Sequence, residues 1–105
     1  MKLLTKELEK KIPALYSTDG KTPLEDKICY IRFFHPRSSW TWFAVEYDPE
    51  SKIFFGWVDG SFPEWGEFSL EEMESVKDSW GLGIERDLYF TPKPMKNIPE
   101  YQKRG

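Results

Sequence analysis

The residue types most often used for catalysis and metal binding are scarce in this chain. It contains one cysteine, Cys29, and one histidine, His35. A single thiol excludes an internal disulfide and a multi-thiolate zinc site, and a lone imidazole lacks the further ligands or the nucleophile that metal and triad chemistry require. We therefore expect neither a metal ion nor another cofactor.

Other motifs with possible chemistry are weak. Glu64 and Glu67 could serve as general acid and base, but no apolar pattern around them predicts the pocket that such a pair requires. Gly81-Leu82-Gly83 is too short for a phosphate-binding loop and precedes no helical pattern, so it indicates the end of a helix. Cys29 lies within a strand pattern, where a small buried side chain is a commoner role than a reactive thiol. These features predict a protein that is not an enzyme.

Acidic residues are concentrated in the middle of the chain. Residues 46–78 hold ten Asp or Glu against two Lys or Arg, in a chain of formal net charge −3. Such a surface repels phosphates and attracts cationic grooves. An ordinary solvated surface also explains the block, because carboxylates in the first turn of a helix interact favourably with its dipole. The candidate partner-binding residues are Glu64, Glu67, Glu71, Glu72, Glu74 and Asp78.

Aromatic residues form the second candidate surface. The stretch SWTWFAVEY, residues 39–47, holds four aromatic residues in nine. Strand alternation would place Trp40, Trp42, Ala44 and Glu46 on one face and the residues between them on the other. Core packing accounts for most of the rings, because aromatic side chains dominate the energetics of small cores. The alternative is a stacking surface for single-stranded nucleic acid, with candidate residues Arg32, Arg37, Trp40, Trp42 and Trp57.

Two helices and several strands must position these residues. Residues 5–12 predict an N-terminal amphipathic helix with Thr5 as its N-cap and Pro13 beyond its end. Ser69-Leu70-Glu71-Glu72 matches a capping box and predicts a second helix near residues 69–78. Strand patterns occupy residues 27–34, 40–47, 53–58, 65–68 and 84–90, separated by turn residues.

The element order predicts an α+β fold. We expect a single domain over residues 1–105 with a mostly antiparallel sheet of four to five strands and helices on one face. The central strands are apolar on both faces, so the second face requires a cover from loops, the tail or a partner. Residues 1–91 are expected to form the core. Residues 92–105, with three prolines, are expected to form an extended, loosely held tail.

No segment predicts contact with a membrane. No apolar run approaches the roughly 18 residues of a membrane-spanning helix, and the first residues lack the apolar region of a secretory signal. We expect a cytoplasmic protein. The pattern leaves the oligomeric state open.

Four segments carry a family resemblance: LLTKELEKKIPALYSTDG, SWTWFAVEYDPESKIFFGWVDG, GEFSLEEMESV and IERDLYFTPKP. Through them the chain, from Leu3 to about Pro94, resembles a family of small bacterial proteins catalogued as a domain of unknown function and commonly carried on plasmids, phages and conjugative elements. One branch of that family resembles anti-CRISPR proteins, which inhibit the RNA-guided nuclease of type II systems. The resemblance implies no catalytic residues. Its shared positions are typical of fold maintenance: Trp40, Trp42, Gly56, Asp59, Gly60, Leu88, Tyr89 and Phe90.

Two functional hypotheses follow. The first is a non-enzymatic inhibitor that binds the type II CRISPR effector nuclease with its guide RNA, its carboxylates presenting phosphate-like charge to a groove that normally holds DNA. The alternative is an accessory single-stranded nucleic-acid-binding module of a mobile genetic element. An enzyme acting on a small molecule ranks third and requires a pocket with converging polar groups.

Overall fold

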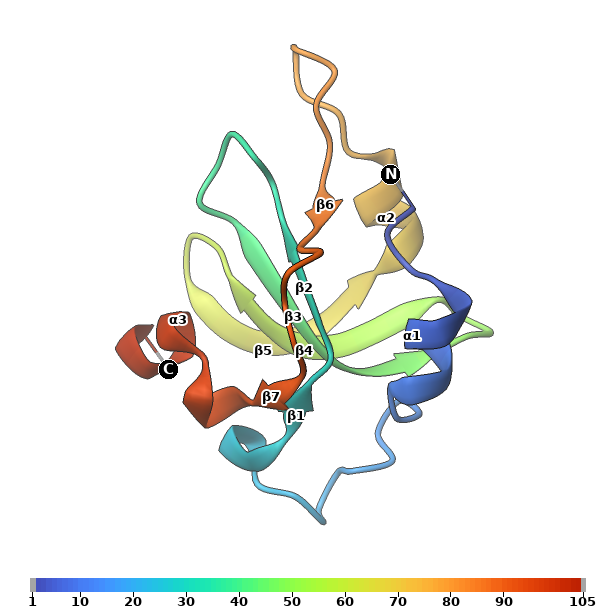
Figure 1. Ribbon diagram of the computed structural model, residues 1–105, viewed down its shortest axis with the longest axis vertical. Helices are drawn as coiled ribbons and strands as arrows, with labels where there is room; N and C mark the ends of the chain where they lie inside the picture. Colours follow the sequence, from blue (N-terminus) through green and yellow to red (C-terminus); the bar gives the residue numbers. More distant parts are fainter. Residues whose placement is uncertain (1, 105) are drawn as a thin grey trace.

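The computed structural model describes residues 2–104 (Figure 1). Its main sheet has the strand order β5-β4-β3-β2-β6, and every pairing is antiparallel. The strands are β2 (Ile31–Phe34), β3 (Thr41–Asp48), β4 (Ile53–Asp59), β5 (Pro63–Ser69) and β6 (Glu85–Arg86). A second sheet pairs β1 (Ile28–Cys29) with β7 (Lys93–Pro94). This arrangement confirms the predicted α+β class and its mostly antiparallel sheet.

Both predicted helices begin where their caps indicate. Before α1 (Lys6–Lys11), the Thr5 hydroxyl accepts a hydrogen bond from the Leu8 N–H at 3.2 Å. Before α2 (Leu70–Ser75), the Ser69 hydroxyl accepts one from the Glu72 N–H, also at 3.2 Å. These bonds satisfy N–H groups that have no partner within the helix.

The second helix is shorter than predicted. Val76 is already extended, with φ −69° and ψ 126°, so α2 ends at Ser75 rather than at Asp78. The Asp78 carboxylate accepts hydrogen bonds from the N–H groups of Trp80 and Leu82. A short polar side chain that bonds nearby backbone in this way competes with helix continuation.

Two predicted strands also differ from the structure. The segment 27–34 is divided at Tyr30, because β1 pairs with β7 while β2 joins the main sheet. The segment 84–90 pairs only at β6, because the Asp87 carboxylate accepts a hydrogen bond from the Tyr89 N–H and turns the chain away. Side-chain turns of this kind compete with strand pairing.

A β-bulge in β3 changes which residues share a face. The register against β4 shifts between Ala44 and Glu46, so Val45 and Glu46 together oppose one position of the partner strand. Val45 therefore packs with Trp57, while Tyr47 packs with Phe54 on the other face. The predicted alternation therefore holds through Val45, which shares the face of Phe43, and is wrong for Tyr47, which lies on the opposite face.

Core residues lie on both faces of the sheet. One face, here called the helix face, packs beneath α1 and α2 through the buried residues Leu3, Leu4, Ile12, Ile31, Phe33, Ala44, Tyr47, Phe54, Leu70, Met73 and Ile84. The opposite face, here called the C-terminal face, holds Cys29, Phe43, Val45, Trp57, Met95 and Ile98. The first and last parts of the chain thus enclose the sheet between them (Figure 1).

The C-terminal segment is part of the fold. Beyond β7 it forms a short 3-10 helix, Met95–Asn97, and then α3 (Pro99–Arg104). Met95 and Ile98 are 0% and 1% exposed. The prediction of an extended, loosely held tail is therefore wrong. Proline stands before the first of these helices and at the first position of the second, where its fixed φ and missing N–H favour helix initiation.

Candidate functional site

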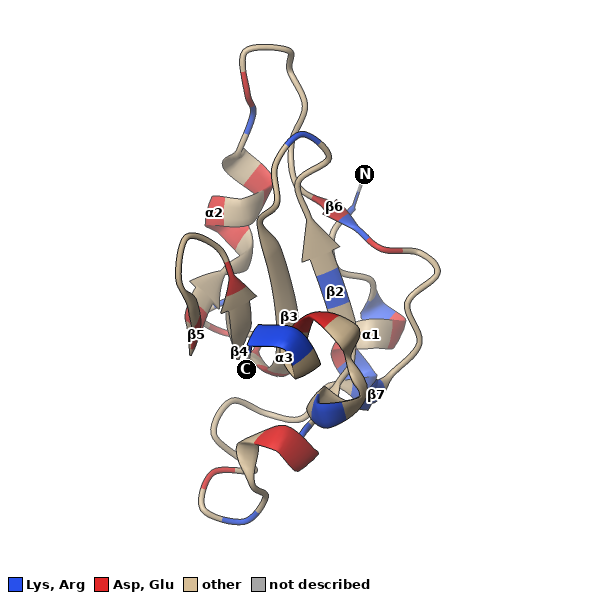
Figure 2. Ribbon diagram, turned by 90° about the vertical axis from the view of Figure 1, so that its left-hand side faces the viewer, with Lys and Arg blue, Asp and Glu red and all other residues tan. Residues whose placement is uncertain are grey.

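The structure separates the six predicted carboxylates. Glu64 opposes Val58 and Glu67 opposes Phe55 in the register of β5 on β4, so the two glutamates lie on opposite faces of this strand. Glu67 accepts a hydrogen bond from the Tyr16 hydroxyl. The predicted acidic surface is thus divided between β5, α2 and the loop after α2 (Figure 2).

Three carboxylates remain together on α2. Glu71, Glu72 and Glu74 are exposed, while Leu70 and Met73 turn inward to the core. Glu71 lies 4.0 Å from the Lys52 ammonium, and among residues 2–104 neither Glu72 nor Glu74 forms an ion pair. Helix geometry explains the grouping. Leu70 and Met73 are three residues apart and share the face that packs on the core, so the three glutamates lie on the remaining, exposed part of the helix.

Two of the α2 carboxylates, those of Glu71 and Glu74, act on the buried phenol of Tyr47. Burial raises the pKa of the Tyr47 phenol, and the negative charges of Glu9, Glu74, Asp48 and Glu71 raise it further. All four carboxylates disfavour a phenolate at this position. Glu71 and Glu74 of α2 therefore lie close enough for their charges to act on Tyr47.

The sixth carboxylate, Asp78, organises a loop instead. Its Oδ2 atom lies 3.8 Å from His35 Nε2 and 3.6 Å from Arg37 Nε. Burial raises the pKa of Asp78, but hydrogen bonds from the Leu82 and Trp80 N–H groups and the charges of His35 and Arg37 outweigh that effect, so the pKa is lowered. Asp78 therefore stays ionised and links the loop after α2 to the loop after β2.

This loop presents a tryptophan to solvent. Trp80 is 70% exposed, and the Arg37 guanidinium lies 4.8 Å from the centre of its ring. The Asp78 N–H donates to the Leu82 carbonyl at 2.8 Å, and the Gly81 N–H donates to the Asp78 carbonyl at 2.9 Å. Gly81 has φ +78°, a conformation that glycine adopts without strain. The loop is ordered by its own hydrogen bonds rather than by burial.

Two further rings lie at the same end of the sheet. Thr41 opposes Asp59, which brings the turn after β4 beside the loop that leads into β3. Trp40 is 40% exposed and Phe62 is 81% exposed. A Cβ on Gly60 would lie 2.4 Å from the Trp40 ring, so this ring rests on the glycine backbone. We call Trp40, Phe62 and Trp80 the aromatic tip.

The structure divides the predicted stacking residues. Trp57 is 2% exposed, so it offers no ring for stacking. Trp42 is partly buried against the core of the helix face. Arg32 forms ion pairs with Asp87 at 3.3 Å and Glu100 at 3.1 Å. Arg37 and Trp40 lie at the aromatic tip, and the half-buried Trp42 ring lies behind Trp40, with 5.9 Å between the ring centres.

Sequence reasoning missed Trp80 and Phe62. Both stand beside turn-forming residues, Gly81 and Pro63, and outside any strand or helix pattern. Aromatic residues at such positions are less often buried than those within alternating patterns, and this signal was present in the sequence.

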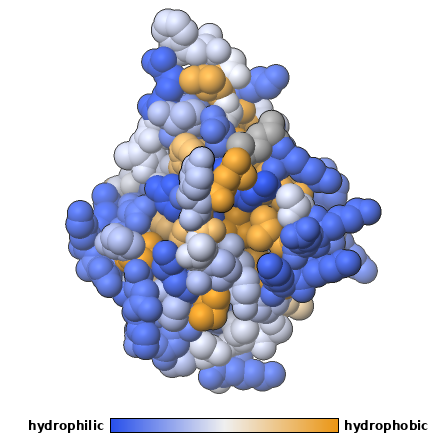
Figure 3. Space-filling view, in the orientation of Figure 1, coloured by the Kyte–Doolittle hydropathy of each residue, from blue (hydrophilic) through white to orange (hydrophobic). Residues whose placement is uncertain are grey.

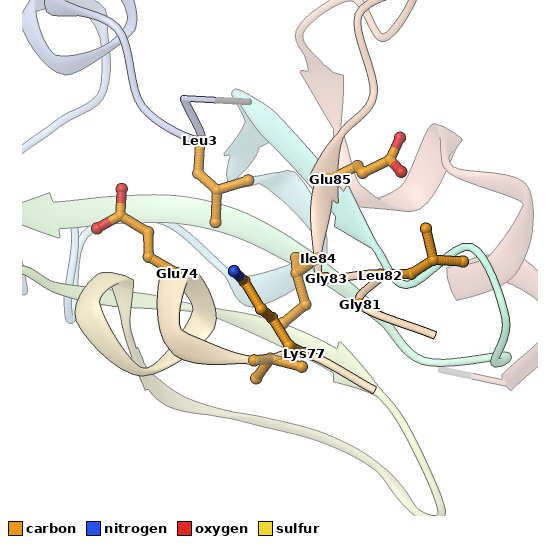
Figure 4. Close-up of a pocket in the computed structure, with 9 residues that line it drawn as sticks. Leu3, Glu74, Lys77, Gly81, Leu82, Gly83, Ile84 and Glu85 are labelled. Atoms are coloured by element: carbon orange, nitrogen blue, oxygen red, sulfur yellow. The ribbon is translucent and has the colours of Figure 1, made fainter. Parts of the chain in front are cut away.

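A hollow lies beside the loop after α2 (Figure 4). Its volume is about 520 Å³, and its lining includes Leu3, Ile84, Glu74, Lys77 and Glu85. Figure 4 shows side chains from the N-terminal segment, from α2 and from the strand entry at Ile84 around it. Its lining mixes apolar and charged side chains.

Leu88 and Tyr89 lie in a different environment from that implied by the resemblance. They are 61% and 93% exposed, on the turn after β6. They line a small hollow together with Phe34. Burial of these two side chains therefore does not maintain the fold.

Figure 3 shows that the visible face is mostly hydrophilic with separate apolar areas, one of them near the upper end.

The remaining candidate groups are structural. Cys29 is fully buried, and burial raises the pKa of its thiol far above the ordinary value, which confirms a small buried side chain. Among residues 2–104, no group of three or more His, Cys, Asp or Glu side chains converges on a possible metal position. Within the same residues no helix has the length and apolarity to span a membrane.

Comparison with known proteins identifies the family. The model of a family described as a protein of unknown function (DUF2958) matches residues 3–104. The chain belongs to this family. No curated protein and no solved structure gave a match. Membership of DUF2958 confirms the predicted relation to a family of unknown function, and its description assigns no activity or residue roles.

Proposed function

We propose that this DUF2958 protein acts as a non-enzymatic binding protein, and that its contact surface combines the aromatic tip with the carboxylates of α2. The observation that carries the proposal is the ordered loop after α2, which holds Trp80 70% exposed against Arg37. Exposed tryptophan and arginine are the residue types most enriched among binding hot spots. Their fixed positions reduce the ordering cost of binding.

The charge of α2 complements this anchor. Ser75, the last residue of the helix, is followed directly by the loop that carries Trp80, so Glu71, Glu72 and Glu74 lie on the adjoining element. A partner that fits would offer an apolar pocket for the ring and a basic surface for the carboxylates. Such complementarity mainly accelerates association and selects the partner.

We infer that the partner is the guide-RNA-loaded effector nuclease of a type II CRISPR system. The four segments of family resemblance and the acidic face of α2 support this target. In this role the protein would serve a mobile genetic element in the cytoplasm of its bacterial host. The α2 carboxylates would occupy a groove where Lys and Arg otherwise hold DNA phosphates.

A cleavage assay tests this proposal. Purified protein is added to the nuclease before or after the guide RNA, and cleavage of target DNA is measured. The test variant carries Lys at Glu71, Glu72 and Glu74. The control variant carries Lys at Glu7, Asp19 and Glu25, which are also exposed carboxylates.

The outcomes separate target from mechanism. We expect inhibition by the parent and the control and at least about tenfold weaker inhibition by the test variant. Equal inhibition by all three would refute the role of charge on α2. Absence of inhibition by the parent would refute the nuclease as target. The proposed contact surface would then be tested separately, by a pull-down with a basic partner protein.

Single-stranded nucleic acid is a second candidate ligand of the same end. It is favoured by Arg37 beside two exposed rings, Trp40 and Trp80. Quenching of tryptophan fluorescence by an oligonucleotide at low salt would support it, with Trp80→Phe as the control for the ring involved. No quenching at low salt would refute this candidate.

A further inference from the structure

The open edge of β5 carries backbone groups that β4 does not use. Leu70 N–H donates to the Lys52 carbonyl at 3.0 Å, and the register from Ser69 to Pro63 continues without a shift. Alternation in an antiparallel pair then directs the backbone groups of Phe68, Gly66 and Glu64 toward β4.

The backbone groups of the residues between them point away from β4. The same alternation directs Trp65 and Glu67 outward with both N–H and C=O, together with the Pro63 carbonyl and the Ser69 N–H. Within residues 2–104, no backbone or side-chain hydrogen bond to these outward groups is present. One face of the strand is also uncovered at its centre, because a Cβ on Gly66 would meet no atom within 4 Å. Figure 2 shows β5 at the margin of the molecule.

We propose that this edge binds an extended, lysine- or arginine-rich peptide segment, which adds a strand to the sheet beside β5. Unpaired edge backbone is the template for strand addition. Charge selects the occupant. Glu64 and Glu67 flank the edge on its two faces, β5 contains no basic residue, and α2 continues the acidic run.

A second copy of this chain is a poorer occupant. An antiparallel pair of β5 strands centred on Gly66 would place Glu67 of each copy diagonal to Glu67 of the other. A cationic segment instead places opposite charges across the strands and can lay a cation on the Trp65 ring.

The inference is independent of the proposed nuclease target, and its test uses a peptide probe. The probe is a nine-residue capped peptide that alternates Lys with Val or Thr, labelled with fluorescein. The matched control replaces each Lys with Glu. Fluorescence anisotropy measures binding at low salt, and amide hydrogen exchange of the protein is followed by NMR with and without the probe.

The exchange pattern gives the decisive readout. We expect the amides of Trp65, Glu67 and Ser69 to exchange fast in the free protein and at least tenfold slower with the lysine peptide. Amides of Phe68 and Gly66, already bonded to β4, should change little. Glu67→Pro removes an outward donor without breaking the pairing with β4, and it should abolish peptide binding, whereas Glu67→Gln should weaken it a few-fold.

Three results would overturn the inference. One is equal binding of the lysine and glutamate peptides, which would remove the charge argument. Another is protection of Phe68 and Trp65 amides to the same extent, which would indicate contact without strand addition. The third is slow exchange of Trp65 and Glu67 in the free protein together with a doubled mass in solution, which would assign the edge to a second copy. Because exchange is read on the parent chain, a folding failure of Glu67→Pro leaves the test intact.

Discussion

Replacement of Glu46 by alanine should strongly destabilise the fold. Glu46 is 1% exposed and its carboxylate lies 3.2 Å from the ammonium of Lys27, which is 5% exposed. The same carboxylate accepts hydrogen bonds from the N–H groups of Tyr16 at 2.7 Å and Thr18 at 3.3 Å, and from the Thr18 hydroxyl. Glu46→Ala therefore leaves a buried cation and two backbone donors without their acceptor.

The size of the effect follows from that environment. Removal of one partner of a buried ion pair costs about 3–5 kcal/mol, a large part of the roughly 5–15 kcal/mol that holds a small domain folded. A loss of that size corresponds to a fall in Tm of more than about 12 °C for a chain of this length. Thr18 and the Phe55 ring, 5.8 Å from Lys27 Nζ, remain beside the ammonium but supply no negative charge.

Urea denaturation monitored by tryptophan fluorescence measures the change. Replacing both partners by apolar residues, Lys27→Met with Glu46→Leu, should cost much less than Glu46→Ala alone, because no unpaired charge is left in the interior. Glu50→Ala, at an exposed turn after β3, provides the control and should stay within about 0.5 kcal/mol. A Glu46→Ala loss below about 1 kcal/mol would show that Lys27 reaches solvent and would refute the reasoning.

Three further predictions concern the C-terminal segment and the aromatic tip. Ile98→Ala should lower the free energy of unfolding by about 2–5 kcal/mol, with Lys103→Ala near zero; equal small losses in urea denaturation would mean that the segment is loosely held after all. Trp80→Ala should leave Tm within a few degrees of the parent but weaken partner binding at least about 30-fold by titration calorimetry. The lowered pKa of Asp78 means that its contribution to loop order is present at neutral pH and disappears as the pH falls below its ordinary value of 3.8. The Trp80 indole NMR signal should therefore shift toward its unfolded position only in that acidic range, and Asp78→Asn should produce the shift at pH 7; an indole signal unchanged in both cases contradicts the assignment.

Several features of this protein could be predicted from the sequence alone, because they depend on residues close together in the chain. Thr5 and Ser69 cap helices through hydrogen bonds that span three residues. The meander of β2 to β5 follows from strand patterns joined by short turns, and the apolar character of both strand faces indicated a second cover. Local hydrogen bonding and periodicity carry this information.

Other features were decided only by contacts between distant segments. Val45 forms a bulge that moves Glu46 onto the same side as Lys27, and no local pattern marks that shift. Met95 and Ile98 supply the cover for the second face, although their proline-rich surroundings suggested a loose tail. Core burial depends on which surfaces meet, so it outweighs local propensity at these positions.

The candidate site shows the same division. The acidic character of residues 46–78 is a property of composition, and the sequence alone determined it. Tertiary structure decided that Glu71, Glu72 and Glu74 stay together, that Asp78 is held by His35 and Arg37, and that Trp80 stands in solvent. The physical reason is distance, because charges and rings act on whatever lies within a few ångströms in space, and separation along the chain does not give that distance.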